Sequence, residues 1–179
     1  IPYIFEAWQK QVANRPNEVF LVDVANNIKF TLKQSDEISG KVYAYLKDKK
    51  IDKDDFVLIN LPRGASTILA MIGVWKAGAA FVVTEDTLAP ERIEYIKKDC
   101  SCKLTIDNDV WEQILEFKPY FGYVKCDNHN AAFAVYTSGS TGSPKGVLHE
   151  FGSLKLLELS AKWNESFFDE PVVNYGMFA

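Results

Sequence analysis

Apolar and polar residues follow one another in short blocks that predict strands and helices in turn. Because strand and helix alternate, we expect an α/β fold with a mainly parallel sheet, alternating helices and right-handed crossovers. The expected strands are apolar runs at 56–59, 80–83, 103–106 and 131–136, and helical spacing of apolar residues recurs at 68–78 and 90–99.

The beginning of the chain has more local signals. Two short apolar runs, 19–22 and 28–31, flank Asn26-Asn27 and predict a β-hairpin. Thr31 followed three residues later by Gln34 is typical of a capping box, so a helix is expected to begin there. The polar clusters 107–109 and 127–130 are expected to form surface turns.

Composition narrows the class of protein. The chain has 179 residues, 47% of them hydrophobic, which is enough for a core of ordinary domain size. Its formal net charge is −4, and its basic residues are interspersed with acidic ones, so we expect no nucleic-acid partner. No apolar run approaches the roughly 20 residues that would span a bilayer. The first residues do not resemble a signal peptide, so we expect a cytoplasmic protein without membrane contact.

The cysteines and histidines offer weak metal signals. Three cysteines, Cys100, Cys102 and Cys126, leave at least one unpaired, so reduced thiols are expected. Cys126 and His129 are close in sequence, but a Cys-x-Cys with a distant Cys-x-x-His is not a standard zinc spacing, and we expect no metal site. His149 either lies near a bound ligand or is simply a polar residue at a strand end.

The segment 137–146 carries the clearest chemistry. It combines hydroxyls, glycines and one lysine directly after the apolar run 131–136, which is expected to hold it at the end of a buried strand. Glycines at 139, 142 and 146 are expected to take positive φ and let backbone N–H groups approach phosphate oxygens. The expected phosphate-binding residues are Thr137, Ser138, Gly139, Ser140, Thr141, Gly142 and Lys145.

Two other interpretations of this segment fit less well. A flexible Gly/Ser linker is normally flanked by polar sequence, whereas this segment continues into Val147-Leu148. The common nucleotide-binding loop requires Gly, four residues and then Gly-Lys-Ser/Thr. That spacing fails, because Pro144 stands five residues after Gly139 and the lysine is followed by Gly146.

The residues 137–146, Thr-Ser-Gly-Ser-Thr-Gly-Ser-Pro-Lys-Gly, resemble the phosphate-binding signature of the adenylate-forming (AMP-binding) superfamily. The segment 75–86 is similar to the Leu-Lys-Ala-Gly-Gly-Ala-Tyr-Val-Pro-Ile-Asp segment of its amino-acid-activating members, and 90–96 continues that similarity. Thr84 and Glu85 depart from it, because the family usually has Pro and Ile or Leu there. The chain is most similar to the first part of an adenylation domain of nonribosomal peptide synthetases.

This resemblance implies an activity with two half-reactions. A carboxylate, here an amino acid, attacks the α-phosphate of ATP, with Mg²⁺ present, and the acyl group then passes to a thiol on the phosphopantetheine arm of a carrier-protein domain. The chain 1–179 is expected to be a partial domain, the first part of the large N-terminal subdomain. It stops before the substrate pocket and the C-terminal subdomain, so we expect no catalytic residue in it and no activity from it alone.

Two alternatives remain open from the sequence. A fragment of an acyl-CoA synthetase shares the phosphate loop, and a non-catalytic nucleotide-binding module would keep the fold without the chemistry. Arg63, which follows an expected strand end, either contacts a ligand or lies on the surface. Truncation within a parallel sheet would leave apolar surface, so self-association is also expected.

Overall fold

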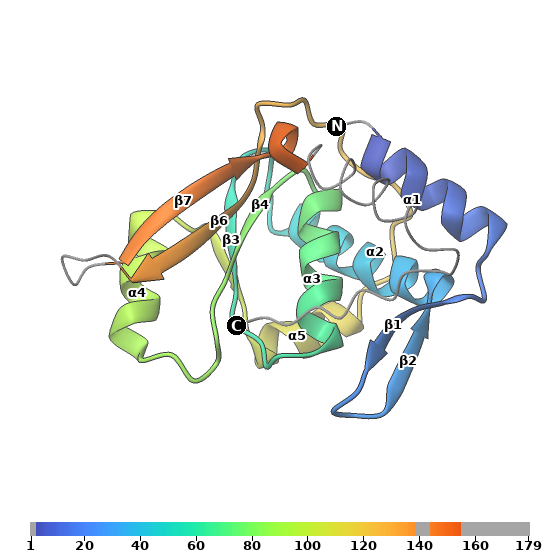
Figure 1. Ribbon diagram of the computed structural model, residues 1–179, viewed down its shortest axis with the longest axis horizontal. Helices are drawn as coiled ribbons and strands as arrows, with labels where there is room; N and C mark the ends of the chain where they lie inside the picture. Colours follow the sequence, from blue (N-terminus) through green and yellow to red (C-terminus); the bar gives the residue numbers. More distant parts are fainter. Residues whose placement is uncertain (1–2, 139–143, 155–179) are drawn as a thin grey trace, which may run out of the picture.

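A computed structural model of the chain describes residues 3–138 and 144–154 (Figure 1). Helices and strands follow one another along most of this length, as the sequence pattern predicted. In chain order they are α1 (Tyr3–Asn14), β1 (Val19–Asp23), β2 (Ile28–Thr31), α2 (Leu32–Asp48), β3 (Phe56–Ile59), α3 (Ala65–Lys76), β4 (Ala80–Val83), α4 (Pro90–Asp99), β5 (Leu104–Ile106), α5 (Asn108–Leu115), β6 (Ala131–Ser138), β7 (Pro144–Glu150) and the 3-10 turn η1 (Phe151–Leu154).

The main sheet has five strands in the order β5-β3-β4-β6-β7. β3 pairs in parallel with β4 and β5, and β4 pairs in parallel with β6. Only the last pairing, between β6 and β7, is antiparallel. The prediction of an α/β fold with a mainly parallel sheet is therefore confirmed, and β1 and β2 form the expected separate hairpin.

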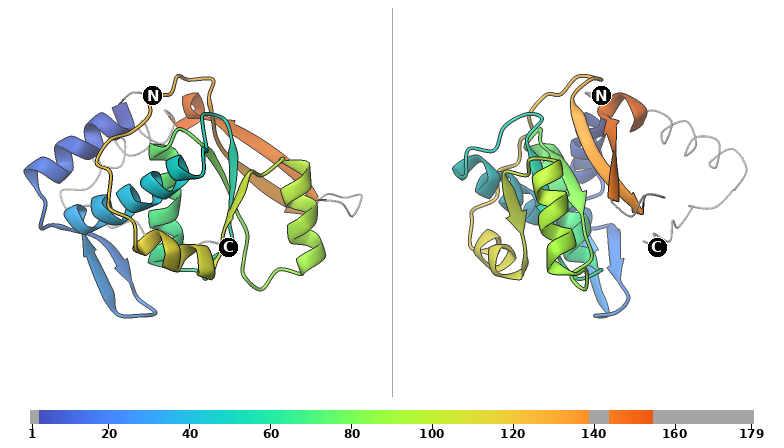
Figure 2. Two further views of the ribbon diagram at one scale, coloured as in Figure 1. Left: turned by 180° about the vertical axis from the view of Figure 1, so that it is seen from behind. Right: turned by 90° about the vertical axis from the view of Figure 1, so that its left-hand side faces the viewer.

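Both faces of the sheet are covered by helices, as a parallel sheet requires. Because side chains alternate along a strand, Val57 and Ile59 of β3 join a core with α2, α3 and α5, whereas Leu58 points to the opposite face. There Leu58 packs with Val82 and with Ile96 of α4. Figure 1 shows β3, β4 and β6 between α4 on one side and α3 on the other, and Figure 2 shows the same layers from behind and from the side.

Local capping signals were interpreted correctly at one helix and wrongly at another. Thr31 and Gln34 form the predicted capping box of α2, with each side chain accepting from the other residue's backbone N–H. The cluster 107–109, predicted as a surface turn, instead begins α5. Asp107 is its N-cap and accepts from the Val110 amide at 3.0 Å. Short polar side chains favour turns and helix starts alike, because both offer free backbone N–H groups.

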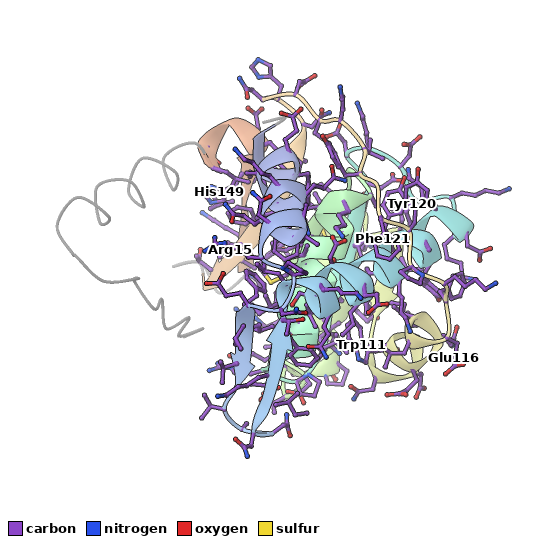
Figure 3. The ribbon with its side chains drawn as sticks, turned by 90° about the vertical axis from the view of Figure 1, so that its right-hand side faces the viewer. Arg15, Trp111, Glu116, Tyr120, Phe121 and His149 are labelled. Carbon is purple, nitrogen blue, oxygen red and sulfur yellow. The ribbon has the colours of Figure 1, made fainter. Side chains whose placement is uncertain are left out.

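The segment after α5 returns along the outside of α2, where Figure 3 labels Tyr120 and Phe121. The Tyr120 amide donates to the Gly40 carbonyl at 3.1 Å, and the Tyr120 ring stacks on Tyr43 with centroids 4.8 Å apart. A Cβ at position 40 would lie 2.7 Å from the Tyr120 carbonyl oxygen. Gly40 is thus required by the close approach of this segment to α2.

Among the described residues, no helix is long and apolar enough to cross a membrane. Cys100, Cys102 and Cys126 form no disulfide in the structure.

Candidate phosphate-binding site

The hairpin of β6 and β7 frames the segment that the sequence singles out. Tyr136 lies opposite Gly146, Thr137 opposite Lys145, and Ser138 opposite Pro144. β6 is the strand expected to hold the segment, and β7 fixes the far end in register with it. Residues 139–143, which join the two strands, lie outside the described residues.

Thr137 and Lys145 are brought together by this register. Residues directly opposite each other in an antiparallel pair have their side chains on the same face of the sheet. Both residues are exposed. A hydroxyl donor and an ammonium group therefore share one face at the end of the hairpin where residues 139–143 join the two strands. This donor set suits phosphate oxygens.

The remaining predicted site residues are located only by their positions in the sequence. Ser138 is the last residue of β6, and its side chain is outside the described part of the structure. Gly139, Ser140, Thr141 and Gly142 also lie outside it. Their role in binding phosphate stays a prediction.

Gly146 has a different role from the one predicted. Among the described residues, the glycine with a positive φ is Gly78, so Gly146 does not take that conformation. A Cβ at position 146 would lie 2.9 Å from Cζ of the Tyr136 ring, which covers the glycine across the hairpin. Gly146 is thus explained by the space that this ring needs, and the prediction of a special backbone conformation there was wrong.

Helix α4 holds the hairpin at two points that the sequence analysis missed. The Tyr136 hydroxyl donates to Asp99 Oδ2 at 2.6 Å, and the Tyr95 hydroxyl donates to the Pro144 carbonyl at 3.2 Å. Burial and the neighbouring Asp99 carboxylate raise the pKa of Tyr136, so its hydroxyl keeps the proton that it donates. The sequence signal that could have pointed to these contacts is the position of Tyr136, directly before the hydroxyl-rich segment.

Polar groups also gather where β3 and β4 end. The Thr84 hydroxyl donates to Asn60 Oδ1 at 3.1 Å. The exposed Arg63 guanidinium forms an ion pair with Glu85. Arg63 thus lies on the surface, and Glu85 serves as its partner.

The two histidines make contacts within and beside the β6–β7 hairpin. His149 stacks on the Phe133 ring across the hairpin, with centroids 4.5 Å apart. His129 lies 3.5 Å from a carboxylate oxygen of Glu150 through Nδ1. In the described ranges 3–138 and 144–154, no group of three or more His, Cys, Asp or Glu side chains could hold a metal ion.

Comparison with known proteins places this geometry in a family. Residues 8–174 match the family described as AMP-binding enzyme. The chain is 33% identical over 144 residues to the probable non-canonical nonribosomal peptide synthetase CymA of Salinispora arenicola, and 31% identical over 165 residues to bacitracin synthase 1 of Bacillus licheniformis. These matches cover 80% and 90% of this chain but only 2% and 3% of those much longer proteins.

Two solved structures share the fold. The N-terminal subdomain of Klebsiella oxytoca NpsA, in complex with 3-hydroxyanthranilyl-AMSN, matches with a TM-score of 0.77 at 22% identity, covering 89% of this chain and 43% of that subdomain. The N-terminal domain of FACL13 from Mycobacterium tuberculosis matches with a TM-score of 0.76 at 21% identity, covering 87% of this chain and 46% of that one. The fold is therefore the first part of the N-terminal subdomain seen in adenylate-forming enzymes, and the chain belongs to the AMP-binding enzyme family.

Proposed function

We propose that this chain is the phosphate-binding part of an ATP-dependent ligase that activates an amino acid. The observation that carries the proposal is the pairing of Thr137 with Lys145 at the loop end of the β6–β7 hairpin, in a chain of the AMP-binding enzyme family. Segment 137–146 holds the triphosphate, with Ser138, Gly139, Ser140, Thr141 and Gly142 supplying the donors between those two residues.

The proposed reaction breaks the bond between the α-phosphorus of ATP and the oxygen that bridges the α- and β-phosphorus. An oxygen of the amino-acid carboxylate bonds to that phosphorus, and pyrophosphate leaves. Negative charge grows on the departing pyrophosphate, where the Lys145 ammonium, the Thr137 hydroxyl and backbone N–H groups stabilise it. Mg²⁺, when bound together with ATP, would supply further neutralisation of the same charge. The residues of this chain bind and orient the triphosphate and form no covalent bond.

In the second half-reaction, the thiol of a carrier-bound phosphopantetheine attacks the acyl carbon, and AMP leaves. Peptide synthetases among the relatives support an amino acid as the substrate and a carrier domain as the partner. The principal alternative is an acyl-CoA synthetase. The likeness to FACL13 and to a fatty acyl CoA synthetase of Mycobacterium tuberculosis, the latter with a TM-score of 0.74, favours it as the second candidate.

The proposal treats chain 1–179 as a partial domain of a cytoplasmic enzyme. It spans 43% of the NpsA N-terminal subdomain and a few per cent of the matched synthetases, so the substrate pocket and the catalytic groups are assigned to sequence outside it. The chain alone is accordingly expected not to form adenylate.

Exchange of labelled pyrophosphate into ATP tests the proposal. The assay compares this chain with the product of the natural gene's full reading frame, over a panel of amino acids, fatty acids and aryl acids. Exchange by the full product with one amino acid supports the proposal and names the substrate. Exchange with a fatty or aryl acid favours the acyl-CoA synthetase, and exchange by neither protein favours the non-catalytic module. Steady exchange by the isolated chain contradicts its assignment as an inactive part.

A further inference from the structure

The C-terminal end of α4 brings two thiols face to face. Cys100 is the C-cap of the helix, and its Sγ lies 2.9 Å from Sγ of Cys102. Ser101 between them has a φ of 52°, in the left-handed region. The Ser101 amide donates to the Lys98 carbonyl, and the Cys102 amide donates to the Lys97 carbonyl. This is the hydrogen-bond pattern of a Schellman motif. The helix end thus fixes the backbone turn that makes the two thiols meet.

This pair is partly accessible, in contrast to a cysteine sealed in a core. Both side chains are partly buried and pack against the cluster of Leu58, Val82 and Ile96. Cys100 Sγ also lies 2.9 Å from the Ile96 carbonyl oxygen. Reactive cysteines generally combine a lowered pKa with this kind of partial exposure.

The two thiols differ in acidity. A hydrogen bond from Cys102 lowers the pKa of Cys100 to about 7, and the same hydrogen bond raises the pKa of Cys102. Cys100 is thus the thiolate of the pair near neutral pH, and Cys102 holds the proton between them. The third cysteine, Cys126, lies 3.8 Å from the Gly78 carbonyl, and burial raises its pKa.

We propose that Cys100 and Cys102 are a reversible redox pair, which a small disulfide such as glutathione disulfide oxidises to an intramolecular disulfide. The Cys100 thiolate attacks one sulfur of glutathione disulfide and forms a mixed disulfide, releasing one glutathione thiolate. Cys102 then loses its proton to solvent and attacks Cys100 Sγ, releasing the second glutathione. Two protein thiols are oxidised, and one glutathione disulfide is reduced to two glutathiones.

Geometry and acidity both favour the closing step. The sulfurs must approach from 2.9 Å to about 2.05 Å, a movement of about 0.9 Å. At pH 7 a thiol with a pKa of about 7 is about half ionised, against about 1% for a thiol at the ordinary value of 9.0. A more acidic thiolate is also less nucleophilic, which offsets about a factor of eight of the gain in ionised fraction. Cys100 is therefore expected to be the attacking thiol of the pair.

The cysteine pair lies next to a contact between α4 and the β6–β7 hairpin. Asp99, which directly precedes Cys100, accepts the hydrogen bond from Tyr136 of β6. The disulfide therefore closes directly beside one of the two contacts between α4 and the hairpin. The oxidation itself does not depend on the proposed ATP site.

Thiol mapping by mass spectrometry tests the redox pair on the whole chain. The protein is equilibrated in glutathione buffers of increasing oxidised fraction, quenched in acid, alkylated and cut with trypsin. Cleavage after Lys98 and Lys103 leaves both cysteines in one peptide, 99–103, and Cys126 in another. We expect peptide 99–103 to lose two hydrogens and resist alkylation, while Cys126 stays alkylated, and dithiothreitol to restore both thiols.

Two variants separate the steps. Cys102→Ser is expected to accumulate the glutathione adduct on Cys100, because the thiol that resolves it is gone. Cys126→Ser is the matched control and is expected to close the disulfide like the wild type. The proposal is overturned if peptide 99–103 keeps two alkylatable thiols in the most oxidising buffer, or if wild-type Cys100 stops at the glutathione adduct.

Discussion

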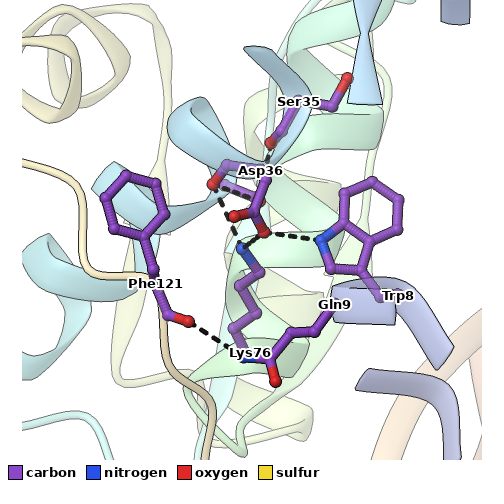
Figure 4. Close-up of polar contacts among 7 residues, drawn as sticks. Trp8, Gln9, Ser35, Asp36, Lys76 and Phe121 are labelled. Atoms are coloured by element: carbon purple, nitrogen blue, oxygen red, sulfur yellow. Dashed lines mark hydrogen bonds and ion pairs between the residues drawn. The ribbon is translucent and has the colours of Figure 1, made fainter. Parts of the chain in front are cut away.

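Lys76 Nζ lies 2.6 Å from Asp36 Oδ1, and the two side chains are only 3% and 10% exposed. The ammonium also donates to the Asp36 backbone carbonyl at 3.2 Å, and the Trp8 indole N–H donates to the same Oδ1 at 2.6 Å (Figure 4). One carboxylate thus joins α1, α2 and α3. Since a buried charge is tolerated only when it is paired and hydrogen-bonded, the three helices are held in one arrangement.

Removing the carboxylate is expected to be far more damaging than removing a surface charge. Asp36→Ala leaves the Lys76 ammonium buried without its partner, and we expect a loss of about 3–5 kcal/mol in the free energy of unfolding by urea. Glu18→Ala, which removes one member of the exposed Arg15–Glu18 pair, is the control and should cost less than about 1 kcal/mol. Equal losses in the two variants would show that burial of the Lys76–Asp36 pair is energetically unimportant.

The same lysine predicts a dependence of stability on alkaline pH. Burial lowers the pKa of Lys76 from its ordinary 10.5, so the folded chain releases this proton at lower pH than the unfolded chain does. Between the lowered pKa and 10.5 the unfolded state binds more protons, and this group's contribution to stability rises with pH. Below that window the contribution is constant.

The measurement is the free energy of unfolding of wild type and Lys76→Met across that pH range. The difference between them should shift in favour of the wild type as pH rises. A difference that is flat, or that moves the other way, would mean that Lys76 is not desolvated in the folded chain.

Asp23 of the β1–β2 hairpin caps a helix that lies far away in sequence. Its Oδ2 accepts from the Ala65 amide at 3.2 Å at the start of α3, whose own N-cap residue, Gly64, has no side chain to do so. We expect Asp23→Ala to cost about 1 kcal/mol in urea unfolding, because a helix N-terminal N–H loses its acceptor. Asp23→Asn keeps an acceptor oxygen and should cost less. Equal costs would indicate that charge, and not the hydrogen bond, is what matters there.

Hydrogen bonds from the Asn26 side chain and from the Ala65 amide lower the pKa of Asp23 below its ordinary 3.8. The stability that it contributes is therefore fully present above 3.8 and is lost as the pH falls through the lowered pKa. In acid unfolding, the gap between wild type and Asp23→Asn should close over that range. A gap independent of pH would contradict the role of the charged carboxylate.

Tyr136→Phe tests whether α4 holds the hairpin. The variant loses the hydrogen bond to Asp99, which is expected to cost about 1 kcal/mol and to speed amide hydrogen exchange in β6 and β7. Tyr120→Phe, on a side chain that is 55% exposed, is the control. If exchange in the hairpin is the same in both variants, the Tyr136–Asp99 contact does not stabilise it.

The features predicted correctly from the sequence are those encoded locally. The hairpin at 19–31 and the capping box of Thr31 and Gln34 depend on residues only a few positions apart, and apolar runs mark β3, β4 and β6 directly. Asp107 was misinterpreted because its side chain can end a turn or begin a helix with the same hydrogen bond. Strand order could not be predicted, since similar apolar runs can be arranged in several ways.

The contacts that hold the helices together and anchor the hairpin were not predictable because they join distant positions. Asp36 and Lys76 are 40 residues apart, Asp23 and Ala65 are 42 apart, and Asp99 and Tyr136 are 37 apart. No spacing rule connects such residues before the fold is known. Thr137 and Lys145 could be assigned to one loop by motif, but their position on one face of the hairpin follows only from the register of β6 and β7.

The central claim is that segment 137–146 binds the phosphates of ATP through Lys145. The most direct measurement is kcat/KM for pyrophosphate–ATP exchange by the full natural protein, compared among wild type, Lys145→Ala and Lys33→Ala. Lys33 is an exposed lysine on α2 and serves as the matched control. We expect Lys145→Ala to lower kcat/KM at least about tenfold, because a charge-assisted contact to phosphate is lost. The kcat/KM of Lys33→Ala is expected to equal that of the wild type. Equal exchange by wild type and Lys145→Ala would contradict the claim.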